Sequence, residues 1–157
     1  MTTTYIALAT TTLSSATSTV TFSSIPATYR DLILVVNGSS SASVVGLAVR
    51  FNSDTGSNYS GVLMQGDGSS AASGTLSGTF AEIGVLVTSR MQAICQIMDY
   101  SATDKHKTFL SRSDGASDRT RATASRWANT AAINTIQVFN TNNNFVVGST
   151  FSLYGVN

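Results

Sequence analysis

The side chains that most often carry catalysis or bind metals are few in this sequence. It contains one histidine (His106), one cysteine (Cys95) and one glutamate (Glu82). His106 lies between two lysines, and no nucleophile and orienting acid are spaced to make it a general base. Cys95 lies in a very apolar segment, which predicts a buried thiol that is not ionised. One histidine and one cysteine cannot supply the usual four ligands of a zinc ion.

The aspartates indicate turns more than chemistry. Glycoside hydrolysis would need two acids held together, one of them in an apolar pocket. Nearly all the aspartates fall at expected strand ends or turns, where this residue type is favoured for backbone reasons alone. They are Asp31, Asp54, Asp67, Asp99, Asp104, Asp114 and Asp118. We therefore expect neither enzyme activity nor a cofactor.

One loop leaves two interpretations open. The segment 52–58 (Asn-Ser-Asp-Thr-Gly-Ser-Asn) places oxygen-bearing side chains at alternate positions, as a calcium loop does. It lacks the bidentate acid that completes such a loop, and Asp54 is its only charged residue. Of the two interpretations, an Asx-turn that closes a hairpin and a site for calcium, we favour the Asx-turn.

Basic residues gather in one part of the chain. Residues 105–126 have a local charge of +4, whereas residues 1–104 have a local charge of −3. A solvated hairpin would explain this segment, with arginine stems lying over apolar neighbours. The same segment could instead form a contact surface, because arginine and tryptophan dominate the binding energy of many interfaces. The candidate interface residues are Arg112, Arg119, Arg121, Arg126 and Trp127.

The composition limits what can position these residues. The chain has 157 residues, of which 42% are hydrophobic and 11% charged, with a net charge of +1. Counting along it gives 24 serines and 22 threonines, which are poor helix formers. A disordered chain, a helical bundle and a dedicated nucleic-acid binder are all disfavoured. The longest apolar runs, of about five residues, predict no membrane span, and residues 1–9 do not resemble a signal peptide, so we expect synthesis in the cytoplasm.

Short apolar segments rich in β-branched and aromatic residues recur between clusters of Gly, Ser, Asn and Asp, and several alternate with a period of two. The predicted strands are 5–10, 20–22, 32–37, 47–51, 60–65, 80–88, 92–100, 108–112, 121–128, 133–139 and 150–155. The segment 92–100 is apolar on both sides, which predicts a central strand. This pattern predicts an all-β protein, one domain over residues 1–157, folded as an antiparallel two-sheet sandwich like a jelly roll.

The residues between the strands predict its connections. Asp67-Gly68 and Asp114-Gly115 are typical tight-turn dipeptides. The only proline, Pro26, indicates a connection between two strands. The segment 69–78, which has little side-chain bulk, predicts a flexible loop.

Three stretches together resemble a family. They are Ile25-Pro26-Ala27-Thr28-Tyr29-Arg30-Asp31-Leu32, the segment from Arg50 to Tyr59, and the final Gly148-Ser149-Thr150-Phe151-Ser152-Leu153-Tyr154-Gly155-Val156. In this order they look like small β-sandwich virion proteins of tailed bacteriophages, which serve as capsid decoration (cement) proteins or as domains of tail fibres.

The resemblance implies a role but no catalytic residue. It implies a decoration protein on the capsid surface, bound to the major capsid protein and to copies of itself as a homotrimer, without a nucleic-acid or membrane partner. We favour the capsid over a fibre because the sequence has no shaft repeats or coiled-coil heptads. The alternatives are a tail or head fibre protein that recognises a host surface, and a lectin-like module that binds sugar through Trp127 or Tyr59.

Overall fold

The computed structural model describes residues 4–42, 44–115 and 119–157. Within these residues the chain forms twelve strands and no helix, and thus no helix long and apolar enough to span a membrane. The strands form two sheets that pack face to face, and every pairing within a sheet is antiparallel. The predicted all-β sandwich is confirmed.

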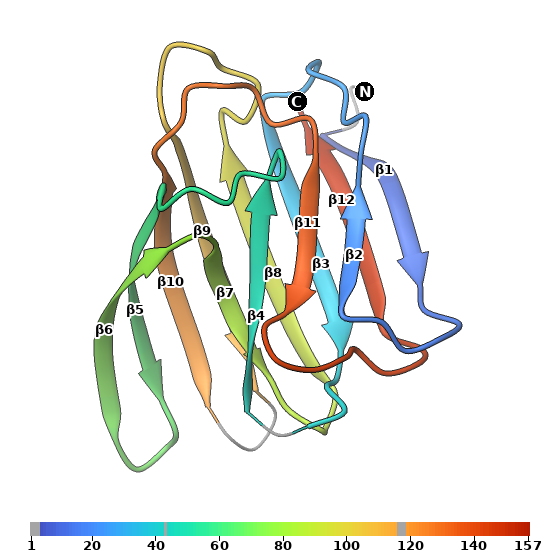
Figure 1. Cartoon of the computed structure of the whole chain (residues 1–157), viewed down its shortest axis with the longest axis vertical. Coiled ribbons are helices and arrows are strands. Elements are labelled where there is room, and N and C mark those ends of the chain that lie inside the picture. The colour runs from blue at the N-terminus through green and yellow to red at the C-terminus, as the bar shows by residue number, and fades with distance from the viewer. Residues whose placement is uncertain (1–3, 43, 116–118) are drawn as a thin grey trace.

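The larger sheet has eight strands and the smaller has four (Figure 1). In spatial order the larger contains β1 (Tyr5–Thr12), β12 (Thr150–Val156), β3 (Asp31–Gly38), β8 (Met91–Met98), β9 (Lys107–Asp114), β10 (Thr120–Trp127), β5 (Tyr59–Gly66) and β6 (Ala71–Gly78). The smaller contains β2 (Thr19–Phe22), β11 (Ile136–Asn140), β4 (Val45–Phe51) and β7 (Ala81–Leu86).

The strand order is that of a jelly roll with two added hairpins. The series β1-β12-β3-β8 and β2-β11-β4-β7 pair early strands with late ones, as a jelly roll does. The hairpin β5–β6 is inserted between β4 and β7, and the hairpin β9–β10 between β8 and β11. The two insertions pair with each other through β5 and β10, and they extend one sheet well beyond the jelly-roll strands.

The core consists of alternate residues of the strands, because successive side chains of a strand point to opposite sides of the sheet. In β3, Leu32, Leu34 and Val36 all point inward and are buried. At the end where the chain crosses from β4 to β5, aromatic rings fill the space between the sheets. The ring of Phe51 packs against that of Phe109 at 5.2 Å and against that of Trp127 at 5.6 Å between centroids.

Small hydroxyl side chains line the interior beneath the added strands. β7 packs over β9 and β10, whose inward residues include Ser111, Ser113 and Thr123. At Gly84 a Cβ atom would lie 2.8 Å from the Cβ atom of Ser113, so the two sheets approach too closely for larger residues. The thin layer thus accounts for the serines and the threonine that point inward from β9 and β10.

All eleven predicted strands are present with slightly different bounds, and β8 is an interior strand of its sheet as predicted. The loop predicted over 69–78 is wrong, since Ala71–Gly78 forms β6. The turn at Asp67-Gly68 is confirmed: the Asp67 carboxylate accepts hydrogen bonds from the backbone amides of Ser69 and Ser70, and Gly68 has a φ of +90°. Pro26 lies between β2 and β3, as expected.

Residues 116–118, which follow the second predicted turn dipeptide Asp114-Gly115, lie outside the described residues. The amide of Gly115 donates a 2.7 Å hydrogen bond to the carbonyl of Arg119, on the far side of that turn. Asp118 lies outside the described residues, as do residues 1–3 of the segment that was compared with a signal peptide.

Candidate interaction surface

The five residues predicted at an interface do not share one surface. Four of them lie in β9 and β10, where successive side chains point to opposite sides of the sheet. Arg112 and Arg126 point outward and are exposed. Arg119 lies just before β10 and is half-buried, at the far end of this hairpin. The structure thus brings only Arg112 and Arg126 together on one outer face.

Trp127 belongs to the core, which corrects its predicted place at an interface. Its side chain is 0% exposed, and its ring stacks on that of Tyr59, with 6.4 Å between the ring centroids. Tyr59 is also buried, and burial raises its pKa to about 12. Neither ring can stack on a sugar, so the lectin-like interpretation loses the two residues on which it depended.

Arg121 is also internal, which is a second correction. Its guanidinium forms a 2.7 Å ion pair with Glu82 on β7 and a 3.0 Å hydrogen bond to the Gln65 side chain on β5. These contacts link the two sheets across the inserted strands. Lys107, counted in the basic segment, is buried as well, and its Nζ donates to the backbone carbonyls of Lys105 and Thr130.

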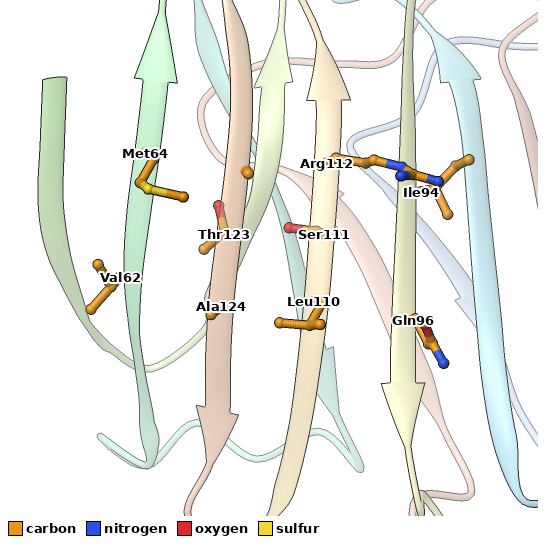
Figure 2. Close-up of a pocket in the computed structure, with 10 residues that line it drawn as sticks. Val62, Met64, Ile94, Gln96, Leu110, Ser111, Arg112, Thr123 and Ala124 are labelled. Carbon is orange, nitrogen blue, oxygen red and sulfur yellow. The ribbon is translucent and has the colours of Figure 1, made fainter. Parts of the chain in front are cut away.

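The outer face of the extended sheet exposes a cluster of apolar side chains. Val62, Met64 and Leu110 are 53%, 65% and 50% exposed, and Ile94 is 37% exposed. They come from β5, β9 and β8, on both sides of β10. Together with their neighbours they line a depression of about 440 Å³ (Figure 2).

Alanines on β10 form the floor of this depression. The pairing register sets Ala122 between Met64 and Arg112, and Ala124 between Val62 and Leu110. Their small side chains leave a channel between the larger side chains of β5 and those of β8 and β9. We call the surface formed by Val62, Met64, Ile94, Leu110, Ala122 and Ala124 the apolar groove.

Arginines lie at both ends of the apolar groove. Arg112 extends from β9 across β8 beside Ile94 (Figure 2). A second depression continues along β10 past Val62 and Leu110 as far as Arg126. None of the described residues that line either depression is acidic. The two depressions therefore combine exposed apolar area with positive charge, and the nearest acid on this side of β9 is Asp114, at the end of the strand.

The residues considered for catalysis lie apart from the apolar groove. Cys95 is fully buried, as predicted, and burial raises its pKa to about 12. His106 is exposed in the connection before β9. Across the described ranges, no three His, Cys, Asp or Glu side chains gather where they could hold a metal ion.

The loop over 52–58 contains the predicted Asx-turn but does not close a hairpin. The Gly56 amide donates to Oδ1 of Asp54 at 2.8 Å, and Asn58 and Trp127 both donate to Oδ2. These hydrogen bonds, that of Asn58 first, lower the pKa of Asp54. The loop joins β4 and β5, which belong to different sheets, so the predicted hairpin is wrong. The carboxylate oxygens that calcium would need already accept internal hydrogen bonds.

Sequence reasoning missed the apolar groove, although two signals pointed to it. The segment 92–100 is apolar on both sides, and the side that faces outward includes Ile94, which is exposed. In β5, Val62 and Met64 alternate with residues that face inward. Alternation identifies the two faces of a strand, but only the strand order shows which face stays uncovered.

No protein-family model matches the sequence, and no curated protein matches it.

Proposed function

We propose that this chain is a structural protein of a bacteriophage virion without enzymatic activity: a capsid decoration protein that binds the outer face of the shell formed by the major capsid protein. The resemblance of three stretches supplies the class of protein. The apolar groove is the observation that carries the binding role, because exposed apolar surfaces of this kind mark interaction sites.

The position of the groove supports a binding role. It lies mainly on β5, β9 and β10, which belong to the hairpins added to the jelly roll, and Ile94 on β8 adds one residue from a jelly-roll strand. Their inner side packs on β7, whereas no described part of the chain covers their outer side. An added sheet region with one face in the core and an apolar opposite face is suited to packing on a second protein.

Charge narrows the chemistry of the partner surface. With Arg112 and Arg126 at its ends and no acid among its described lining residues, the groove complements an apolar segment flanked by acidic side chains. The two arginines would orient that segment along β10, and the apolar side chains would supply most of the affinity.

Binding to purified shells of the encoding phage, stripped of this protein, tests the proposal. Two exposed valines provide a matched pair of variants: Val62→Glu places a carboxylate in the groove, and Val147→Glu places one in the connection before β12. We expect the wild-type chain to bind in stoichiometric number and to raise the temperature at which shells break. Val62→Glu should weaken binding about 100-fold, and Val147→Glu should leave it unchanged.

Two outcomes would refute this assignment. Absence of wild-type binding to shells would remove the capsid role, and binding to host cells instead would favour the fibre alternative. Equal weakening by the two valine variants would show that the groove is not the contact.

A further inference from the structure

Strand β6 forms one outer edge of the eight-stranded sheet, and its ladder with β5 is regular along its whole length. The register runs from Tyr59 opposite Gly78 to Gly66 opposite Ala71 without a shift. An edge strand has unpaired amide and carbonyl groups along its free side, which can pair with another strand. The free side of β6 therefore offers, over a strand of eight residues, the amides and carbonyls of every second residue.

β6 lacks the features that usually block such pairing. Natural edge strands carry lysine, proline or a bulge that prevents another chain from adding to the sheet. The segment Ala71–Gly78 contains only Ala, Ser, Gly, Thr and Leu. At the opposite edge, β1 has a shift in register between Ala7 and Ala9. Of the two edges, β6 is the regular one.

Partly exposed apolar side chains in and beside β6 favour the addition of another strand that would cover them. The smaller sheet ends at β7, which packs chiefly over β9 and β10, so the β5–β6 hairpin extends past it at the lower left of Figure 1. As a result Leu63 and Leu76, which point toward the inner side, stay partly exposed. A strand added beside β6 would cover part of both side chains.

Charge identifies a second copy of this chain as the occupant. Two β6 strands that meet antiparallel about a twofold axis bring no charged side chains of their own together. The same arrangement places the Asp67 turn of one copy beside the opposite end of the other copy's strand. There, Nε of Arg50 donates to the carbonyl of Thr79, directly after β6. The ends of the paired strands are thus complementary, with an exposed carboxylate near a guanidinium.

We infer that two copies of the chain pair through β6, antiparallel and about a twofold axis, so that their eight-stranded sheets become one. A pairing of like edges closes with two copies. It differs from the threefold trimer that the resemblance implies, and the mass of the assembly separates the two. The apolar groove, on the face of the sheet, stays open in the pair.

Sedimentation velocity and hydrogen exchange of the full chain, from micromolar to millimolar concentration, test this inference. We expect a species of two copies. As its population rises with concentration, the amides in 71–78 that face away from β5 should exchange about tenfold more slowly, with no such change in 5–12. Thr75→Lys places a charge on the exposed middle of β6 and should abolish pairing. Thr12→Lys, the same change on exposed β1, should leave pairing intact.

A monomer at every concentration, an assembly of three copies, or slower exchange at both edges would overturn the inference. The exchange measurement on the wild-type chain decides the question even if Thr75→Lys fails to fold. Pairing is measured without shells, so it does not rest on the proposed function. If the chain forms pairs but does not bind shells, only the capsid role is refuted. If it binds shells but remains a monomer, only the pairing is refuted.

Discussion

The indole Nε1 of Trp127 donates a 2.7 Å hydrogen bond to Oδ2 of Asp54, 73 residues earlier in the chain. Asp54 lies in the connection that carries the chain from one sheet to the other, and Trp127 ends β10. The same carboxylate also accepts from the side chain of Asn58 and the amide of Gly56. One half-buried acid therefore fixes the point where the inserted hairpin β5–β6 leaves the jelly-roll strands.

Removing this carboxylate should be costly. Asp54→Ala leaves the buried indole N–H of Trp127 without its acceptor and removes the Asx-turn, so we expect the free energy of unfolding to fall by about 2–4 kcal/mol. Asp104→Ala, the same change at an exposed position, should alter it by less than about 0.5 kcal/mol. Urea unfolding followed by tryptophan fluorescence measures both. Similar small losses in the two variants would contradict the role given to Asp54.

Acid should weaken the fold through its aspartates. Hydrogen bonds from Asn58 and Trp127 lower the pKa of Asp54. Burial on its own raises the pKa of Asp31, but hydrogen bonds from Arg30 and from the Asp99 amide outweigh it, and the pKa is lowered. Such acids bind fewer protons in the folded state. Their contribution to stability is therefore complete above the unfolded pKa, about 3.9, and is lost as the pH falls through the folded value.

Urea unfolding at a series of pH values checks this sign. The free energy of unfolding should be level from neutral pH to about pH 5 and should fall below that. Asp54→Asn, whose amide does not titrate in this range, should start lower and fall less steeply. Parallel curves for the two proteins would show that Asp54 does not contribute to the acid sensitivity.

The strands were predictable because their residues alternate, but β6 was not. Its small residues have low strand propensity, and it becomes a strand because the Asp67 turn folds it back on β5, which supplies the ladder. Strand order was not predictable either. The pairing of β5 with β10 joins two strands that begin about sixty residues apart, and no local feature of either strand specifies it.

The candidate interface was predictable only in part. Alternation in β10 separates Trp127 from Arg126, but the usual rule for choosing the inner face fails there. The inner face holds Thr123 and the outer face holds Ala122 and Ala124, so the outer face is the more apolar except at Trp127. The close approach of β7 requires small inner residues, and the local sequence does not reveal that approach.

Gly155 in β12 has a packing role that can be tested. A Cβ atom there would lie 2.4 Å from Cγ of Tyr29, whose ring lies against the strand. Gly155→Ala should therefore reduce the free energy of unfolding by about 1–3 kcal/mol. Gly74→Ala is the control, because its new methyl group would meet only Leu63, at 3.9 Å.

A double variant tests whether the clash with the ring of Tyr29 causes the loss of stability in Gly155→Ala. If the clash with the ring is responsible, Gly155→Ala should add little cost in a Tyr29→Ala background, as a double-mutant cycle of thermal or urea unfolding would show. An undiminished cost in that background would place the strain in the backbone of β12 instead.

Replacing Thr123 by valine should stabilise the fold. Its buried Oγ1 has no hydrogen-bond partner among the described residues, and the side chain faces the thin layer beneath β7. A hydroxyl without a partner costs its full desolvation free energy, whereas a methyl group of similar size fits the same space. Thr123→Val should raise the free energy of unfolding by about 1 kcal/mol, and Thr120→Val, exposed on the same strand, should change it by less than about 0.5 kcal/mol. A loss of stability in Thr123→Val alone would mean that the hydroxyl is satisfied in solution and that this layer is less tightly closed than its packing indicates.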